Sequence, residues 1–146
     1  MSANSRMTVA IHVLSYLSSA QRKRPDPVTS DQVAYSVNTN PVVIRRLLGL
    51  LQKGGIVESH RGAHAGWTLA KPPSRITLAD VYRSVVEDPL FALHAAPPNQ
   101  KCPIGRGIQP ALKKVYGELE DKLAAHLSRT TVEQVLCDTI GPAPKS

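Results

Sequence analysis

One short loop gathers several side chains that could bind a ligand. It lies inside Glu58–Ala70 and holds Arg61 together with His60 and His64. Two histidines four residues apart share one face of a helix and could bind a metal ion there. Strand-like residues flank this loop, so His60 and His64 bracket the tip of a hairpin, and their spacing does not predict a metal site. The loop is therefore either a plain turn or a finger whose arginine contacts a partner.

Cys102 is a second residue with reactive potential. It lies between Lys101 and Pro103, near Arg106 and just before a long predicted helix. Cations and a helix N-terminus favour the reactive thiolate form of cysteine. Cys102 is therefore a possible redox sensor, and the alternative is an ordinary reduced thiol without a role. Together with Cys137 it makes only two cysteines, which are not in CxxC spacing, so we predict neither a disulfide framework nor a metal site.

The sequence lacks the residue patterns of an enzyme or a membrane protein. It has no nucleophile–base pair, no paired carboxylates on one helix face and no phosphate-binding glycine loop, so we do not expect catalysis. No apolar run approaches about 18 residues, and the N-terminus lacks the layout of a signal peptide. We therefore expect a soluble, cytoplasmic protein that does not contact a membrane.

The positive charge is confined to the first half of the chain. The 146 residues carry a formal net charge of +7. Residues 1–75 contain ten Lys or Arg and three Asp or Glu, whereas residues 76–146 contain eight of each kind. This asymmetry favours a first half that binds a polyanion such as nucleic acid and a second half with another role. The alternative is a basic half that is merely soluble.

Hydrophobic periodicity and capping residues predict three helices in the first half. The first covers residues 5–20. The second covers about 29–36, where Thr29 and Gln32 form a capping box. The third begins after Asn40, a good N-cap followed by proline, and ends at Gly54 with its neighbouring glycine.

Two strands and a fourth helix follow. Ile56–His60 and Trp67–Ala70 read as short strands that are joined by the arginine loop, where two glycines permit the turn. We expect Trp67 to pack this hairpin onto the rest of the domain. A capping box at Thr77 and Asp80 begins a helix that runs to about residue 87.

The second half reads as a loop, a long helix and a short helix. Residues 88–103 contain four prolines without a sustained period, and a last capping box at Thr130 and Glu133 precedes the short helix. Residues 108–127 form an apolar stripe suited to burial against a partner. The stripe consists of Leu112, Val115, Tyr116, Leu119, Leu123 and Leu127. We therefore divide the chain into residues 1–87, 88–107, 108–128 and 129–146.

The order helix, helix, helix, hairpin, helix is that of a winged helix-turn-helix domain. The fold class is thus mainly α with a small β-hairpin, followed by a long C-terminal helix. In this geometry the N-terminal residues of the third helix contact base edges in the major groove. Those residues are Asn40, Val42, Val43, Arg45 and Arg46. Arginine can bind guanine through two hydrogen bonds, and the alternative is two solvated arginines on a polar face.

The segment NPVVIRRLLGLLQKGGIVESHRGAHAGWTLAKPPSRITLADVYRSV resembles the Rrf2 family of winged-helix transcription regulators. The resemblance is continuous from about Val28 to Val86. Its most specific part is the strand–RG–loop–G–aromatic–strand segment, followed by Lys71-Pro72-Pro73 and by Ile76-Thr77-Leu78.

This resemblance implies a homodimeric, sequence-specific DNA-binding regulator, a repressor or an activator, with repression favoured. The wing arginine, Arg61, would enter the minor groove, and the helix over 108–127 would pair with its copy in the dimer. Two-fold symmetry then predicts a near-palindromic operator. The expected DNA-binding residues are Thr29, Asn40, Val42, Val43, Arg45, Arg46, Arg61, Gly62 and His64.

The chain also departs from the family. Many members hold an iron–sulphur cluster with three cysteines after the fourth helix, and this chain has only Cys102 there. We therefore expect no cofactor, and an unidentified redox or small-molecule signal. The alternative function is a winged-helix module that binds protein without sequence-specific DNA binding. Salt-sensitive binding to duplex DNA distinguishes the two.

Overall fold

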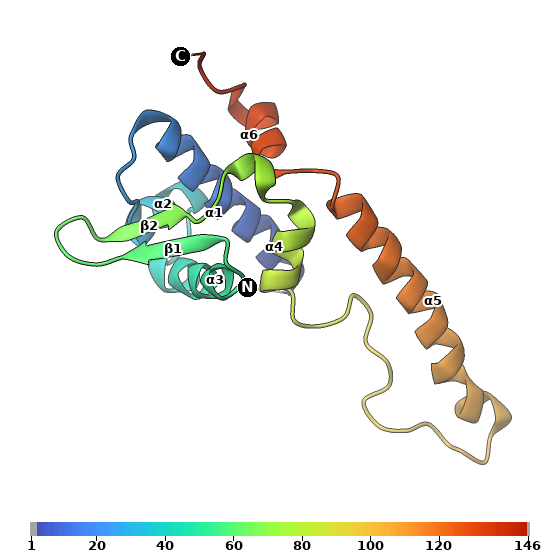
Figure 1. Ribbon diagram of the computed structural model, residues 1–146. Helices are drawn as coiled ribbons and strands as arrows, with labels where there is room; N and C mark the ends of the chain where they lie inside the picture. Colours follow the sequence, from blue (N-terminus) through green and yellow to red (C-terminus); the bar gives the residue numbers. More distant parts are fainter. Residues whose placement is uncertain (1–2, 146) are drawn as a thin grey trace.

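Three helices form the N-terminal part of the computed structural model, which describes residues 3–145 (Figure 1). They are α1 (Ala3–Lys23), α2 (Ser30–Val37) and α3 (Pro41–Lys53). The predicted capping box of α2 is present: the Thr29 hydroxyl accepts from the Gln32 N–H at 3.2 Å, and the Gln32 side chain accepts from the Thr29 N–H at 2.9 Å. The first three predicted helices are therefore confirmed. Helix α1 extends to Lys23, and Arg22 in this last turn donates to the Gly141 carbonyl at 3.0 Å.

An antiparallel hairpin and α4 complete the winged helix-turn-helix arrangement. Strand β1 (Val57–His60) pairs with β2 (Gly66–Leu69), with Val57 opposite Leu69 and His60 opposite Gly66. A single 3-10 turn, η1 (Pro73–Arg75), leads to α4 (Leu78–Val85). Figure 1 shows the hairpin projecting from the domain beside α3.

Asp80 caps α4 as the sequence predicts. Its carboxylate accepts from the Thr77 N–H at 3.0 Å, and its own N–H donates to the Thr77 hydroxyl at 3.1 Å. Arg83 and Lys71 lie 2.6 Å and 3.7 Å from the same carboxylate. Burial alone would raise the pKa of Asp80, but the hydrogen bonds with Thr77 and the two cations hold it below its usual value.

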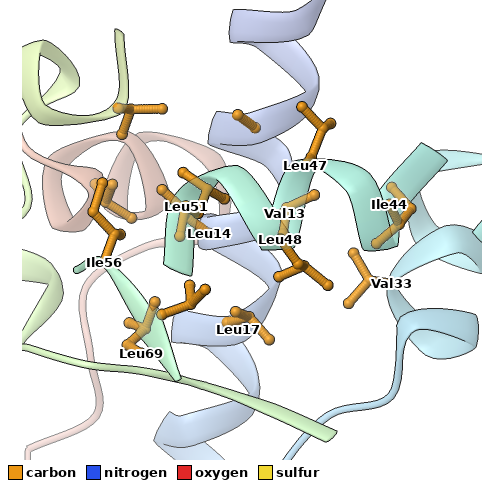
Figure 2. Close-up of a cluster of buried hydrophobic side chains, with 14 of the residues drawn as sticks. Val13, Leu14, Leu17, Val33, Ile44, Leu47, Leu48, Leu51, Ile56 and Leu69 are labelled. Carbon is orange, nitrogen blue, oxygen red and sulfur yellow. The ribbon is translucent and has the colours of Figure 1, made fainter. Parts of the chain in front are cut away.

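The core lies where α1, α2, α3 and the hairpin converge (Figure 2). Trp67 packs against this core and is half-buried, in agreement with its predicted role. The side chains labelled in Figure 2 are Val13, Leu14, Leu17, Val33, Ile44, Leu47, Leu48, Leu51, Ile56 and Leu69. Burial of the apolar stripe of each helix fixes how α3 and the wing are presented to solvent.

The long helix α5 (Pro103–Leu127) begins five residues before the predicted start at 108. Proline suits the first helical turn, and Cys102 occupies the N-cap position without a side-chain capping bond. Figure 1 shows α5 extending away from the domain. No helix within residues 3–145 is long and apolar enough to cross a membrane.

The last helix, α6 (Val132–Ile140), packs beside α1 and η1 of the N-terminal domain. Its capping box is Thr131 with Gln134, one residue later than the predicted pair Thr130 and Glu133. The shift follows from a backbone contact, because the Thr130 carbonyl accepts from the Leu78 N–H at 2.9 Å and leaves the next threonine to cap. Val132 is fully buried in the shared core, so α6 is part of the domain and not a separate tail.

Candidate nucleic-acid interface

The turn between α2 and α3 is fixed by two asparagines. Asn38 ends α2 in the left-handed conformation, with φ 63°. Asn40 begins α3, and its side-chain oxygen accepts from the Val42 N–H at 2.9 Å. Both asparagines match the roles that such residues favour at helix ends. The N-terminus of α3 is therefore held in a defined position at the surface.

One side of α3 is buried and the opposite side is open to solvent. Four residues form the buried side: Ile44, Leu47, Leu48 and Leu51. At about 100° per residue, Val42, Arg46, Gly49 and Lys53 lie along the opposite side, and we call them the outer row. Arg45 is exposed beside this row, whereas Val43 is half-buried at its border with the core. Val42 leaves 57% of its surface exposed.

The three arginines predicted to bind DNA keep their charges unpaired. Arg45, Arg46 and Arg61 are exposed, and among the described residues none of them forms an ion pair or a hydrogen bond. Some other arginines are engaged internally, as Arg22 is with Glu133 at 3.4 Å, whereas Arg24, Arg75 and Arg129 also lack a side-chain partner among the described residues. The charges of α3 and of the wing are therefore free for an external anion.

The wing is attached to the domain by more than its own hairpin. Trp67 exchanges two backbone hydrogen bonds with Val28, of 3.0 Å and 2.8 Å, so Val28, two residues before α2, forms an antiparallel bridge at the edge of the hairpin. The Gln52 side chain of α3 donates to the Ser59 hydroxyl of β1 at 3.1 Å. These contacts hold the wing and α3 as one surface. The sequence does not predict the bridge at Val28, because a single extended residue is too short to show the alternation of apolar and polar residues that indicates a strand.

Two glycines shape the wing in different ways. Gly62 has φ 93° and open space around it, so it serves the turn alone. Gly66 has φ 149°, and a Cβ there would lie 2.7 Å from the Val28 carbonyl oxygen. Glycine is thus required at Gly66 both by its backbone conformation and by the close approach of another chain segment. His64 is exposed at the tip, whereas His60 hydrogen-bonds the Thr68 hydroxyl across the hairpin at 2.8 Å.

Residues of α2 border the same surface. Thr29 is exposed, but its hydroxyl is used in the capping box of α2. Tyr35 is 91% exposed, and it lines a shallow depression with Asn38 and Pro41 at the start of α3. Sequence reasoning missed Tyr35, although the spacing of the buried Val33 does place it on the outward side of α2.

The structure divides the predicted apolar stripe of α5 into two faces. Residues 86–102, which join α4 to α5, form a linker. Tyr116 is half-buried against Phe91 of this linker, and Leu123 and Leu127 are half-buried beside α4 and the linker. Val115 and Leu119 are 55% and 39% exposed and lie on the adjacent face. Two further residues belong to that exposed face or its border, namely Ile104, which is 74% exposed, and Leu112.

A single carboxylate joins α5 to the domain and to the linker. Glu120 accepts from the Tyr82 hydroxyl of α4 at 3.2 Å and from the Leu90 N–H of the linker at 2.8 Å. Burial and the nearby Glu120 charge raise the pKa of Tyr82. Glu120 therefore links α5 both to α4 and to the segment that joins the two helices.

Comparison with known proteins decides the family. The family described as "Rrf2: Iron-dependent Transcriptional regulator" matches residues 3–138. The chain belongs to the Rrf2 family. It is 40% identical over 134 residues to "Putative HTH-type transcriptional regulator YwnA" of Bacillus subtilis, covering 91% of this chain and 96% of that protein. The HTH-type transcriptional regulator CymR of the same species is 25% identical over 122 residues, covering 84% and 81%.

Solved structures agree with the fold. The crystal structure of a "putative DNA binding protein" matches with a TM-score of 0.71 and 36% identity, covering 90% of this chain and 99% of that one. The mainly helical fold with a hairpin wing and a long C-terminal helix is therefore confirmed, as is the resemblance to the Rrf2 family of transcription regulators.

The two cysteines of this Rrf2 protein do not fit an iron–sulphur cluster within one chain. Cys102 and Cys137 stand beyond opposite ends of α5, whose 25 residues span about 37 Å. A cluster normally takes four cysteine ligands within a few ångströms of its irons. Within residues 3–145, no group of three or more His, Cys, Asp or Glu side chains is arranged to hold a metal ion.

Proposed function

We propose that this Rrf2 protein regulates transcription by sequence-specific binding of a homodimer to duplex DNA in the cytoplasm. One observation carries the proposal. Helix α3 and the wing, which are joined by the hydrogen bond between Gln52 and Ser59, present Arg45, Arg46 and Arg61 without a partner among the described residues. Arginine binds both phosphates and guanine edges through paired hydrogen bonds.

The proposed docking follows from the position of each element. Helix α3 enters the major groove with Asn40, Val42 and the two arginines at its exposed start, and Arg61 extends from the wing toward the minor groove. Helix α2 would then cross the DNA backbone, where the exposed Tyr35 hydroxyl, which has no hydrogen-bond partner within residues 3–145, would bind a phosphate.

The decisive test combines sequence selection with single substitutions. Duplexes selected from random DNA give the operator, and fluorescence anisotropy then measures the affinity of the wild type and its variants. Arg45→Ala, Arg46→Ala and Arg61→Ala should each weaken binding, by about tenfold for a lost base contact. Loss of a phosphate contact should make the negative slope of log affinity against log salt concentration shallower, by about one.

A charge-matched control separates specific contacts from net charge. Arg75 is exposed on η1, which packs beside α6. Arg75→Ala removes the same charge and should leave affinity within about twofold. Binding that does not depend on salt, or equal losses for all four variants, would refute the docking and favour a protein-binding module.

We also propose that α5 pairs with its copy through its exposed apolar face, which contains Val115 and Leu119. Isolated apolar side chains are common at surfaces, but a row of them along one face of a projecting helix is typical of an interface. Two-fold pairing presents two α3 helices and predicts a near-palindromic operator, with half-sites about one helical turn or a multiple apart.

Analytical ultracentrifugation tests this pairing. Leu119→Glu places a charge in the proposed interface and should give a monomer. Ala124→Glu makes the same charge change on the opposite side of α5 and should leave the dimer intact. A dimeric Leu119→Glu protein would place the interface elsewhere.

We propose further that the protein works without an iron–sulphur cluster, because Cys102 and Cys137 are separated by the length of α5. Reconstitution with iron and sulphide under anaerobic conditions should give no cluster absorption. The redox role of Cys102 stays a prediction. It fails if Cys102→Ser keeps the full response of operator binding to oxidant.

A further inference from the structure

Gly49 lies inside α3, where glycine is among the least favourable residues. Two internal causes can require glycine at a position, namely a left-handed backbone or a close neighbour. The first is absent, since Gly49 has ordinary helical dihedrals and is not among the described glycines with positive φ.

The second cause is absent as well. A Cβ built on Gly49 meets no heavy atom within 4 Å among the described residues. Gly54, at the end of the same helix, shows the contrast, because a Cβ there would collide with the Ser84 hydroxyl of α4. Within residues 3–145 neither the backbone nor a neighbouring atom therefore requires glycine at Gly49, which directs attention to a contact outside the chain.

The position of Gly49 on α3 indicates which external partner would contact it. It belongs to the outer row, between Arg46 three residues before it and Lys53 four residues after it, and both cations are exposed. An α-helix with its side chains is about 10–12 Å wide, and the major groove is about 12 Å wide. A helix in the groove thus has almost no clearance, and a missing side chain lets its backbone come closer.

We propose that Gly49 is the point of closest approach between α3 and the duplex, where Arg46 and Lys53 on either side bind phosphates. This inference rests on the proposed DNA binding and deepens it. Gly49 acts as a positioning residue: it sets how deeply α3 lies in the groove, and so whether the side chains at the start of the helix reach the base edges.

The test uses two effects of opposite sign. Gly49→Ala improves helix propensity in open space, so the melting temperature of the free protein should rise by about 2–5 °C. The same methyl group should lower operator affinity about fivefold or more, as an added group does in a closely packed contact. Gly49→Leu should lower affinity further while the protein stays folded. A purely structural role for Gly49 cannot raise stability and weaken DNA binding together.

Gly117 provides the matched control. It is helical, lies in α5, and also has no atom within 4 Å of a built Cβ. Gly117→Ala should leave operator affinity unchanged. Gly49→Ala with unchanged affinity, or with a lowered melting temperature, overturns the inference. A wild-type protein that binds no duplex at all refutes the proposed function itself, which is a distinguishable result.

Discussion

Replacement of Gly66 by alanine should detach the wing from the domain. The new Cβ would lie 2.7 Å from the Val28 carbonyl oxygen, 2.9 Å from its carbon and 3.0 Å from the Pro27 Cβ. Two of these atoms are backbone, so the clash cannot be relieved by a side-chain rotation. At least one of the two hydrogen bonds between Val28 and Trp67 has to break.

The cost of Gly66→Ala follows from two terms. A residue other than glycine at this φ costs about 1–3 kcal/mol, and each lost hydrogen bond costs about 0.5–1.5 kcal/mol. Together these terms give about 2–6 kcal/mol, a large part of the total stability of about 5–15 kcal/mol. Urea unfolding followed by fluorescence measures this loss, and Trp67, the single tryptophan of the chain, reports directly on the bridge.

Gly62→Ala is the control for Gly66→Ala. It introduces alanine at a positive φ of 93°, but with no atom within 4 Å of the new Cβ. It should therefore show the conformational cost without the clash and keep the emission of Trp67. The reasoning is refuted if both variants unfold at the same urea concentration with the same tryptophan spectrum.

Three further predictions concern single groups. If Val42 contacts a thymine methyl, deoxyuridine at one operator position per half-site should weaken wild-type binding, and Val42→Ala should abolish that difference in anisotropy titrations. The pKa of Asp80 is lowered in the folded protein. Its contribution to the free energy of unfolding is therefore fully present above its unfolded pKa of about 3.9, and it is lost as the pH falls through the folded pKa. The stability difference between wild type and Asp80→Asn, measured by urea unfolding from pH 7 to pH 2, should shrink over that range; a constant difference contradicts it. Gly54→Ala should lower stability by about 1–3 kcal/mol, because its Cβ meets the Ser84 hydroxyl, and adding Ser84→Ala should recover part of that loss.

Local signals made much of this fold predictable. The capping boxes at Thr29 and Thr77 and the N-cap Asn40 each depend on residues within three positions, so the sequence shows them directly. The outward arginines of α3 follow from the period of its buried stripe. These are the elements that form the candidate DNA interface.

Contacts between distant residues could not be predicted in the same way. The bridge from Val28 to Trp67 and the burial of Val132 in the domain core join segments far apart in the chain. Periodicity predicts that the whole apolar stripe of α5 forms one interface, because it does not distinguish residues that pack within the chain from residues that pack against a partner. The structure assigns Tyr116 to an internal contact and leaves Val115 exposed.

The return of the chain after α5 makes residues 87–129 an insertion within a continuous domain. The Thr130 carbonyl is bound to the start of α4, and Val132 donates its N–H to the Ile76 carbonyl at 2.9 Å. The two ends of the insertion are thus separated by little more than α4, whose eight residues measure about 12 Å. A peptide of about six residues between Val86 and Thr130 is long enough to span that gap. A protein in which this peptide replaces residues 87–129 should be a folded monomer with the complete α3 and wing. It would allow the affinity of one protomer for one half-site to be measured.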